Sequence, residues 1–431
     1  MLKRITQVQT GETPALLWSF TYFFCLLCGY YILRPIRDEM GIQGGVQSLP
    51  WLFSGTFAAM LIAVPVFGWL SARLPRRRLL PVIYYFFVAN LLLFFVLLKN
   101  QVAAVYTARA FFIWLSVFNL FVISVFWSFM VDLFNKGQAQ RLFGFIAAGG
   151  STGALIGPAL AAILAVPLGP ANLLLVSAAF LILAIICIHR LANWATLHGK
   201  AGASSGDAVI GGGVWAGVGI IFKSPYLGWI CLYIVLYTTL STFLYLEQAR
   251  IVADTFDVPA RRTSLFASMD FAVNTMAFLG QLFLTGKIVT RFGISAALVL
   301  VPILSILGFI VLGLLPVLAV LVVFQIIRRA GDFIFARPAR EMLFTVLSRE
   351  AKYKSKNFID TVVYRGGDAA SGWLFAALGA IGLGLSGIAF VAVPLAAAWL
   401  TTGLVLGRKY NVLNPKTDAA DETGRRKYGE Y

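Results

Sequence analysis

Two long apolar runs near the end of this sequence, 317–335 and 358–383, contain ionisable side chains. An ionisable group at membrane depth is costly, so such residues are the first candidates for binding or coupling. Arg328 and Asp332 are four residues apart and can pair across one helical turn, which leaves a structural ion pair as the alternative. The candidates in these runs are Arg328, Arg329, Asp332, Asp360, Tyr364, Arg365 and Asp368.

The second of these runs places Asp360, Tyr364 and Asp368 on one helical face, with Arg365 beside them. We expect Arg365 and Asp368 to face a central cavity. There, one side chain can bind an anion and the other can adjust the local charge or receive a proton.

Polar residues in a third run, 264–285, are separated by steps of four and seven: Asp270, Asn274 and Gln281. These steps place them in one stripe of an otherwise apolar helix, which must face protein or water. The stripe can line a pathway or form hydrogen bonds between helices, and the spacing does not choose between the two. Asn119 is a candidate for the opposite wall.

The first apolar run ends with Arg34 and Arg37. Arg34 falls at the outer boundary of the expected helix, where a long cationic side chain can reach lipid headgroups as an anchor. The alternative is a basic rim that draws an anion into a vestibule.

Composition indicates the elements that carry these residues. Hydrophobic residues make up 60% of the 431 residues and charged residues 12%, against about 25% charged in an average soluble domain. A span needs about 20 largely apolar residues, so the chain has room for about a dozen. The predicted spans are 15–36, 51–70, 79–98, 105–133, 142–166, 171–188, 226–248, 264–285, 294–314, 317–335, 358–383 and 386–406. We therefore predict an all-α integral membrane protein with twelve transmembrane helices.

A repeat divides these spans into two halves. Gly68 and Arg73 after the second span recur as Gly286 and Arg291 after the eighth, and Gly149 in the fifth span recurs as Gly366 in the eleventh, at almost the same separation. The predicted organisation is a six-helix half (1–190), a cytoplasmic linker (191–224), a second six-helix half (225–410) and a cytoplasmic tail (411–431).

The charge pattern predicts the orientation. Most of the 35 basic residues fall in the segments that are cytoplasmic if the N-terminus is cytoplasmic. We therefore expect a multi-pass protein of the cell inner membrane with both termini in the cytoplasm. The same bias accounts for the net charge of +17, so nucleic acid is not an expected partner.

Metal and enzyme chemistry are not expected. Cys25 and Cys28 form a CxxC inside the first span, but no nearby histidine or further cysteine completes a metal site, so packing is their expected role. Both histidines, His189 and His198, fall at the linker. The sequence predicts no catalytic residue, metal or cofactor.

Six plus six helices, a central linker and the glycine and arginine of the turns after spans two and eight resemble the major facilitator superfamily. The resemblance implies two pseudo-symmetric halves that rock around a central solute site, with Arg73 in a gating turn. Ala72 stands where that family usually has aspartate. Gly149, Gly153 and Gly157 resemble an antiporter-associated motif, and the alternative is close helix packing.

The stretch 336–368 resembles the corresponding part of the ADP/ATP translocases, a nucleotide-exchanging branch. The shared patterns are Pro338, Arg340, Glu341 and Met342; Lys354, Lys356, Ile359 and Asp360; and, in the first span, Leu33, Arg34, Arg37 and Asp38. The resemblance implies that Arg37 and Lys356 contact phosphates, although Arg37 replaces the usual lysine.

The leading hypothesis is a secondary active transporter that moves an anionic or zwitterionic organic solute, such as a nucleotide or organic phosphate, by alternating access. The alternative is proton-coupled transport of amphipathic compounds or siderophores. A lipid transferase and a non-transporting sensor or scaffold are the other classes. The expected partners are a small-molecule solute, a coupling proton and membrane lipids. The predicted solute-binding residues are Arg34, Arg37, Asn119, Asn274, Arg328, Arg329, Lys356, Tyr364 and Arg365, and the predicted coupling or gating residues are Asp270, Asp332, Asp360, Asp368 and Arg73.

Overall fold

The structure, a computed structural model, describes residues 9, 11–73, 76–197, 219, 221 and 224–414, and these residues form helices and connecting turns with no strand. Their contacts define two compact units. Unit 1 comprises Met1–Gly211 and Ala249–Thr275, and unit 2 comprises Gly212–Gln248 and Met276–Tyr431. The predicted domain boundaries stay a prediction. Most of the predicted linker and tail lies outside the described residues.

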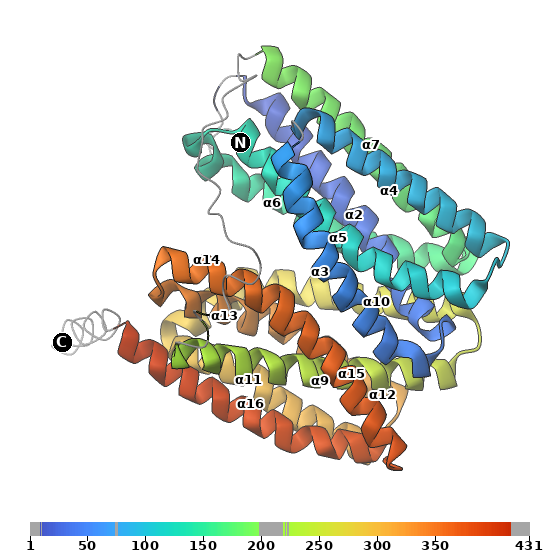
Figure 1. Cartoon of the computed structure of the whole chain (residues 1–431), viewed down its shortest axis with the longest axis vertical. Helices are drawn as coiled ribbons and strands as arrows, with labels where there is room; N and C mark the ends of the chain where they lie inside the picture. The colour runs from blue at the N-terminus through green and yellow to red at the C-terminus, as the bar shows by residue number, and fades with distance from the viewer. Residues whose placement is uncertain are drawn as a thin grey trace. The chain divides into compact units, whose positions relative to one another are not determined.

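Unit 1 is built around its first helix, α2. This helix packs against α5, α6 and α7, and α4 packs against α7 (Figure 1). Large aromatic side chains fill the space between these helices, including the stacked rings of Phe23 and Phe126. The helices are α2 (Thr13–Gln43), α3 (Leu49–Arg73), α4 (Arg76–Lys99), α5 (Ala104–Leu133), α6 (Lys136–Leu168) and α7 (Pro170–Leu197).

Glycines on α6 allow its backbone to approach that of α2. A Cβ atom on Gly149 would overlap the carbonyl oxygen of Phe20, one on Gly153 would overlap that of Phe24, and one on Gly157 would lie 2.6 Å from that of Cys28. Side chains cannot relieve these clashes, because the obstacle is backbone. Close helix packing therefore accounts for the glycine pattern of the fifth span.

A buried carboxylate joins the start of α2 to α6. Glu12 accepts hydrogen bonds from Gln138 Nε2 at 2.7 Å and from Arg141 at 3.1 and 3.2 Å. Burial acts to raise the pKa of Glu12, but the hydrogen bonds of Arg141 and Gln138 outweigh burial and lower the pKa to about 2. Glu12 is thus ionised at neutral pH and anchors both helices.

We expect Glu12→Gln to lower the thermal stability of the detergent-solubilised protein, because it leaves Arg141 without its carboxylate, at a cost of about 2–3 kcal/mol. The folded-state pKa lies below the ordinary value of 4.5, so the stabilisation is complete above pH 4.5 and is lost as the pH falls toward 2. The difference in melting temperature between wild type and variant should be the same at pH 6 and pH 8. A difference that changed between these values would contradict this assignment.

The remaining helices form unit 2, apart from the stretch 249–275 at the end of α9 and the start of α10, which belongs to unit 1. The longer helices are α9 (Pro225–Thr255), α10 (Pro259–Gly280), α11 (Gly286–Leu314), α12 (Leu318–Gly331), α15 (Tyr364–Ala380) and α16 (Leu385–Leu413). Its shorter segments are α13 (Arg337–Leu343), η5 (Phe344–Val346) and α14 (Arg349–Phe358), together with three π-helical turns: η3 (Gln281–Thr285), η4 (Asp332–Ala336) and η6 (Ile359–Val363). The short segment η1 (Val46–Ser48) belongs to unit 1.

Nine helices of the described part are long and apolar enough to cross a membrane. The predicted eighth, tenth and eleventh spans are not among them. They form α10, α12 and α15, each adjoined by one of the π-helical turns η3, η4 and η6. π-Helical turns are rare and occur frequently at functional sites, and these three spans hold most of the predicted site residues.

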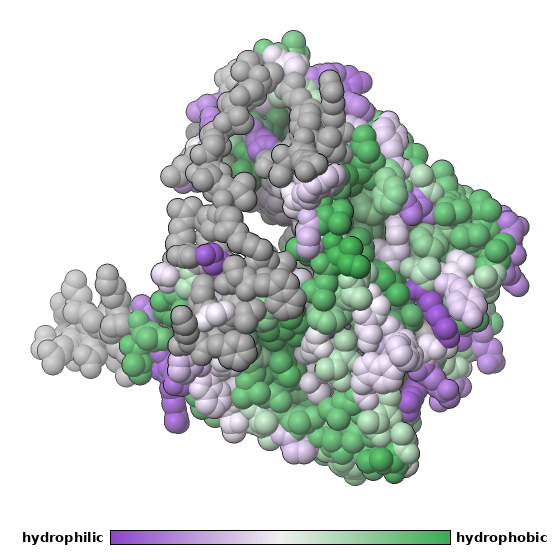
Figure 2. Space-filling model, in the orientation of Figure 1, coloured by the Kyte–Doolittle hydropathy of each residue, from purple (hydrophilic) through white to green (hydrophobic). Residues whose placement is uncertain are grey.

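Large apolar side chains are exposed on both units, including Trp51 and Ile163 in unit 1 and Leu282 and Leu314 in unit 2. Figure 2 shows large hydrophobic areas on the face in view, with hydrophilic residues beside them. Such surfaces fit a lipid environment, so the predicted all-α membrane fold is confirmed.

Candidate functional site

A ladder of polar side chains joins α9 to α12 inside unit 2. Its three hydrogen bonds connect residues in antiparallel order: as the residue number rises along α9, the number of the partner residue falls. They are Tyr237 Oη to Asp332 at 3.1 Å, Arg328 Nη2 to Ser241 Oγ at 3.2 Å, and Gln325 Nε2 to Gln248 Oε1 at 2.8 Å. Helical spacing produces this arrangement, since positions 325, 328 and 332 recur at i, i+3 and i+7 on one face.

Arg328, in the middle of the ladder, is only 3% exposed. Its Nη2 atom contacts Ser241 and, at 3.4 Å, Gln325 Oε1, whereas Nε and Nη1 have no hydrogen-bond partner. No carboxylate of the described residues forms a salt bridge with it. A buried cation with two unused donor positions lacks the anion that would offset its desolvation.

The ion pair that the sequence allows between Arg328 and Asp332 does not form. Asp332 instead accepts a hydrogen bond from Arg337 Nε at 2.9 Å and one from Tyr237. The π-helical turn η4 begins at Asp332, and Arg337, five residues further on, lies one such turn away and takes the place of Arg328 as its partner. Asp332 is neutralised on its C-terminal side, and Arg328 is left with neutral partners.

The π-helical turns also provide the contact between the neighbouring spans. Gln281 Nε2 donates to the carbonyl oxygen of Phe333 at 3.0 Å, and Thr285 Oγ1 donates to that of Ile334 at 2.9 Å. A π turn disturbs the regular carbonyl pairing of a helix, and side chains of η3 satisfy the carbonyls of η4. Gln281 itself is exposed and lies in unit 2, so it does not share one buried stripe with Asp270 and Asn274.

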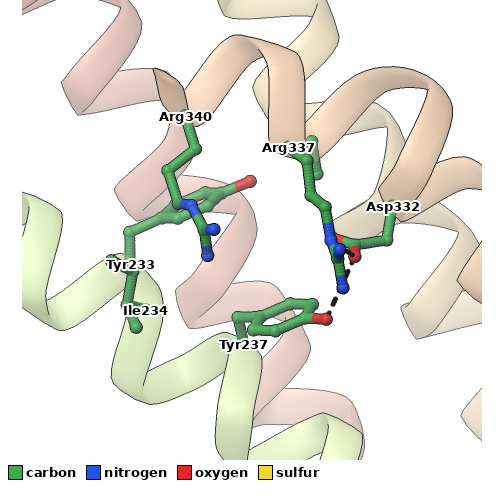
Figure 3. Close-up of a pocket in the computed structure, with 7 residues that line it drawn as sticks. Tyr233, Ile234, Tyr237, Asp332, Arg337 and Arg340 are labelled. Carbon is green, nitrogen blue, oxygen red and sulfur yellow. Dashed lines mark hydrogen bonds and ion pairs between the residues drawn. The ribbon is translucent and has the colours of Figure 1, made fainter. Parts of the chain in front are cut away.

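A small pocket lies beside the last rung of the ladder, between α9, η4 and α13. Figure 3 shows the guanidinium groups of Arg337 and Arg340 reaching it from two sides, with the ring of Tyr237 between them. Arg337 is held by Asp332 and lies over the ring of Phe333 at 4.2 Å. Sequence reasoning did not select Arg337 or Arg340 as binding residues.

On α15, Asp368 lies 3.6 Å from Arg365 and accepts a hydrogen bond from Thr242 of α9 at 3.3 Å. The ring of Tyr364 lies 5.9 Å from that of Tyr237. The structure thus brings these three predicted residues, Tyr364, Arg365 and Asp368, next to α9. Arg365 and Asp368 satisfy each other in part, unlike Arg328.

Predicted residues near the start of the eleventh span lie apart from this group. Lys356 pairs with Glu341, and Asp360 is exposed on the π-helical turn η6. That turn interrupts the α-helical register on which the shared face of Asp360 and Tyr364 depended. Arg329 is half-buried beside Arg328.

In unit 1, Arg34 pairs with Asp270 at 2.6 Å, and the aspartate side chain is only 2% exposed. Arg34 is therefore tied to α10, rather than free to reach headgroups or to form an open rim. Asn274 Nδ2 donates to the carbonyl oxygen of Ala154 at 2.7 Å, which is a hydrogen bond between helices.

A second buried ion pair joins α2 and α10. Arg262 Nε and Nη2 donate to the two carboxylate oxygens of Glu39 at 2.7 and 2.8 Å, and Glu39 is 0% exposed. Neither residue was predicted as a site residue.

The other predicted residues of unit 1 make fewer polar contacts. Arg37 lies over the ring of Phe112 at 4.3 Å, and its Nε has no hydrogen-bond partner. Asn119 is half-buried, with an Oδ1 atom that accepts no hydrogen bond. Arg73 is the last residue of α3, and its side chain lies outside the described part.

The sequence contained a signal for the ladder. The run TTLSTFLYLEQ, at 238–248 in the seventh predicted span, is unusually polar for a span and supplies Ser241, Thr242 and Gln248. These hydroxyl and amide groups carry no formal charge, and the site was predicted from ionisable residues, so they were not predicted as site residues.

The family model of the Major Facilitator Superfamily matches residues 12–340. The chain belongs to the Major Facilitator Superfamily. It is therefore a multi-pass membrane protein of a transporter family. No curated protein sequence matches it.

Solved structures share the fold at low sequence identity. A bacterial homologue of the iron transporter ferroportin, in an inward-facing state, has a TM-score of 0.65 and 13% identity over 93% of this chain and 98% of its own. The nucleoside transporter NupG has a TM-score of 0.60 and 14% identity over 95% and 99%. A bacterial metal transporter has 0.61 and 13% over 94% and 99%. These similarities show the fold and leave the solute open.

Proposed function

We propose that this member of the superfamily is a secondary active transporter of an organic solute that carries a carboxylate or phosphate group, and that Arg328 binds this group. The supporting observation is the burial of the Arg328 guanidinium without a carboxylate partner among the described residues. A guanidinium offers five N–H donors in a planar fork that matches carboxylate and phosphate oxygens. A bound anion would supply the partner that the protein does not.

The neighbours of Arg328 suit the rest of such a solute. Ser241, Gln325 and Gln248 offer neutral donors and acceptors, which can contact hydroxyl or amide groups without repelling an anion. Arg365 of α15 provides a second cation in the same unit. Nucleotides and organic phosphates belong to this class, in line with the resemblance of 336–368 to nucleotide exchangers and with the structural similarity to a nucleoside transporter.

The proposal includes alternating access between two six-helix halves, residence in the cytoplasmic membrane and both termini in the cytoplasm. Proton-coupled transport of amphipathic compounds is less well supported. Its sequence arguments were the glycine pattern of the fifth span and Asp270 or Asp368 as proton carriers. Contact of α6 with α2 accounts for these glycines, and the two aspartates lie against Arg34 and Arg365.

The test is uptake or exchange by purified protein in liposomes, with nucleotides, organic phosphates, carboxylates, siderophores and peptidoglycan fragments as candidates. For a transported anion, Arg328→Gln should weaken apparent affinity by about ten- to a hundredfold, because a hydrogen-bonded charge contact contributes about 1.5–3 kcal/mol. Arg328→Lys should recover part of the loss.

The control is Arg408→Gln, which removes an exposed arginine near the end of α16. It should transport as the wild type does. Unchanged transport by Arg328→Gln, or inhibition by hydrophobic cations and not by anions, would contradict the proposal.

A further inference from the structure

The pocket at Arg340 is separate from Arg328. The two arginines are twelve residues apart on consecutive helical segments, and a rise of about 1.5 Å per residue separates them by about 18 Å. The rung formed by Tyr237, Asp332 and Arg337 lies between them. One carboxylate or phosphate group therefore cannot contact both arginines.

Charge at the pocket is not balanced by the lining residues. Asp332 is paired with Arg337, while Arg340 forms no hydrogen bond or salt bridge with any described residue. Asp360 is near enough to be affected by the charge of Arg340, but no ion pair joins the two, and Asp360 does not line the pocket. The lining thus holds two guanidinium groups and one carboxylate, with a surplus of one positive charge.

The hydroxyl groups of both tyrosines in the pocket already donate to other acceptors, so the guanidinium groups are the donors that remain for a ligand. The hydroxyl of Tyr233 donates to the carbonyl oxygen of Leu298 at 2.9 Å, and that of Tyr237 donates to Asp332. Figure 3 shows the guanidinium of Arg340 pointing toward the pocket, across from Arg337. An acceptor placed between them would meet N–H groups from both sides and the ring of Tyr237 below.

We infer that this pocket binds one oxyanion group with a single negative charge, either a carboxylate or a phosphodiester, with Arg340 as its main ligand. A single charge balances the surplus on the lining. The pocket is far smaller than the roughly 300–1,000 Å³ typical of sites for whole organic ligands. The pocket therefore takes one group, from a free carboxylate or from the headgroup of an acidic lipid.

Modification by phenylglyoxal, followed by mass spectrometry of the full chain, tests this site. In dodecyl maltoside micelles with chloride as the only anion, Arg340 should react. Sodium acetate at the same ionic strength should slow its modification by a factor of 1 + [L]/Kd, about tenfold when acetate is about ten times Kd. Arg408, which is exposed, should react at the same rate with either salt.

Nanodiscs distinguish the two sources of the group. Protection of Arg340 by acetate in micelles supports a free carboxylate. Protection in phosphatidylglycerol discs, with little in phosphatidylcholine discs, supports a lipid phosphodiester.

Two outcomes would overturn the inference: Arg340 unreactive in chloride micelles, or Arg340 protected by acetate no more than Arg408 and modified equally in both kinds of disc. The Arg328→Gln variant keeps this pocket intact and should show the same protection at Arg340. A failure of the proposed solute site is therefore distinguishable from a failure here.

Discussion

Replacement of Gly153 by leucine should prevent the protein from folding into a stable detergent-solubilised form. A Cβ atom at this position would press against the carbonyl oxygen of Phe24 and lie 2.9 Å from the amide nitrogen of Cys28. Both obstacles are backbone atoms of α2, so α2 and α6 must separate. Because α2 is the helix on which unit 1 packs, the cost should exceed the usual cost of overpacking, about 1–3 kcal/mol.

Gly144 is the matched control, since it lies on the same helix and a Cβ atom there meets nothing within 4 Å. Size-exclusion chromatography and thermal denaturation should give aggregated or strongly destabilised protein for Gly153→Leu and near wild-type behaviour for Gly144→Leu. Gly153→Ala should fall between them. If Gly153→Leu were monodisperse and as stable as Gly144→Leu, the close approach of α2 and α6 would be wrong.

Most of the fold could be predicted from the sequence, because a span needs a long apolar run and such runs are visible in composition. The run predicted at 105–133 corresponds to α5, Ala104–Leu133, with one residue of difference. Family membership was predictable from the repeated glycine and arginine turns. The π-helical turns were not, because a single inserted residue per turn leaves no periodic signal in a short segment.

The candidate site was predictable only in part. Arg328 stood out because a charge in an apolar run is conspicuous, yet its partners are neutral. Ser241 lies on α9, far away in the sequence, and Gln325 lies one turn earlier on the same helix. The partner of Asp332 was misjudged because it is Arg337, five residues further on across the π-helical turn η4, a spacing that an α-helical pattern does not consider. Glu39 and Arg262, more than 200 positions apart, could not be matched from one sequence, because nothing in either segment indicates which distant charge it meets.

Glu39→Gln should lower the free energy of unfolding by about 3–5 kcal/mol, since it leaves Arg262 buried without its charge partner. Glu39 is entirely buried, and the side chain of Arg262 is 12% exposed, so water cannot replace the lost contacts. Both donors of the fork, Nε and Nη2, lose an ionised acceptor. Thermal or denaturant unfolding of the detergent-solubilised protein measures the change.

The double variant Glu39→Gln with Arg262→Met separates the contribution of the pair from the cost of an isolated charge. Removing both partners should be less harmful than Glu39→Gln alone, because no unpaired guanidinium is then buried. Arg34→Gln is the comparison, since it breaks the other α2–α10 pair, that of Arg34 with the buried Asp270. Additive effects of the Glu39 and Arg262 substitutions would contradict a direct ion pair, whereas a large coupling energy would show that these residues hold the first part of α10 against α2.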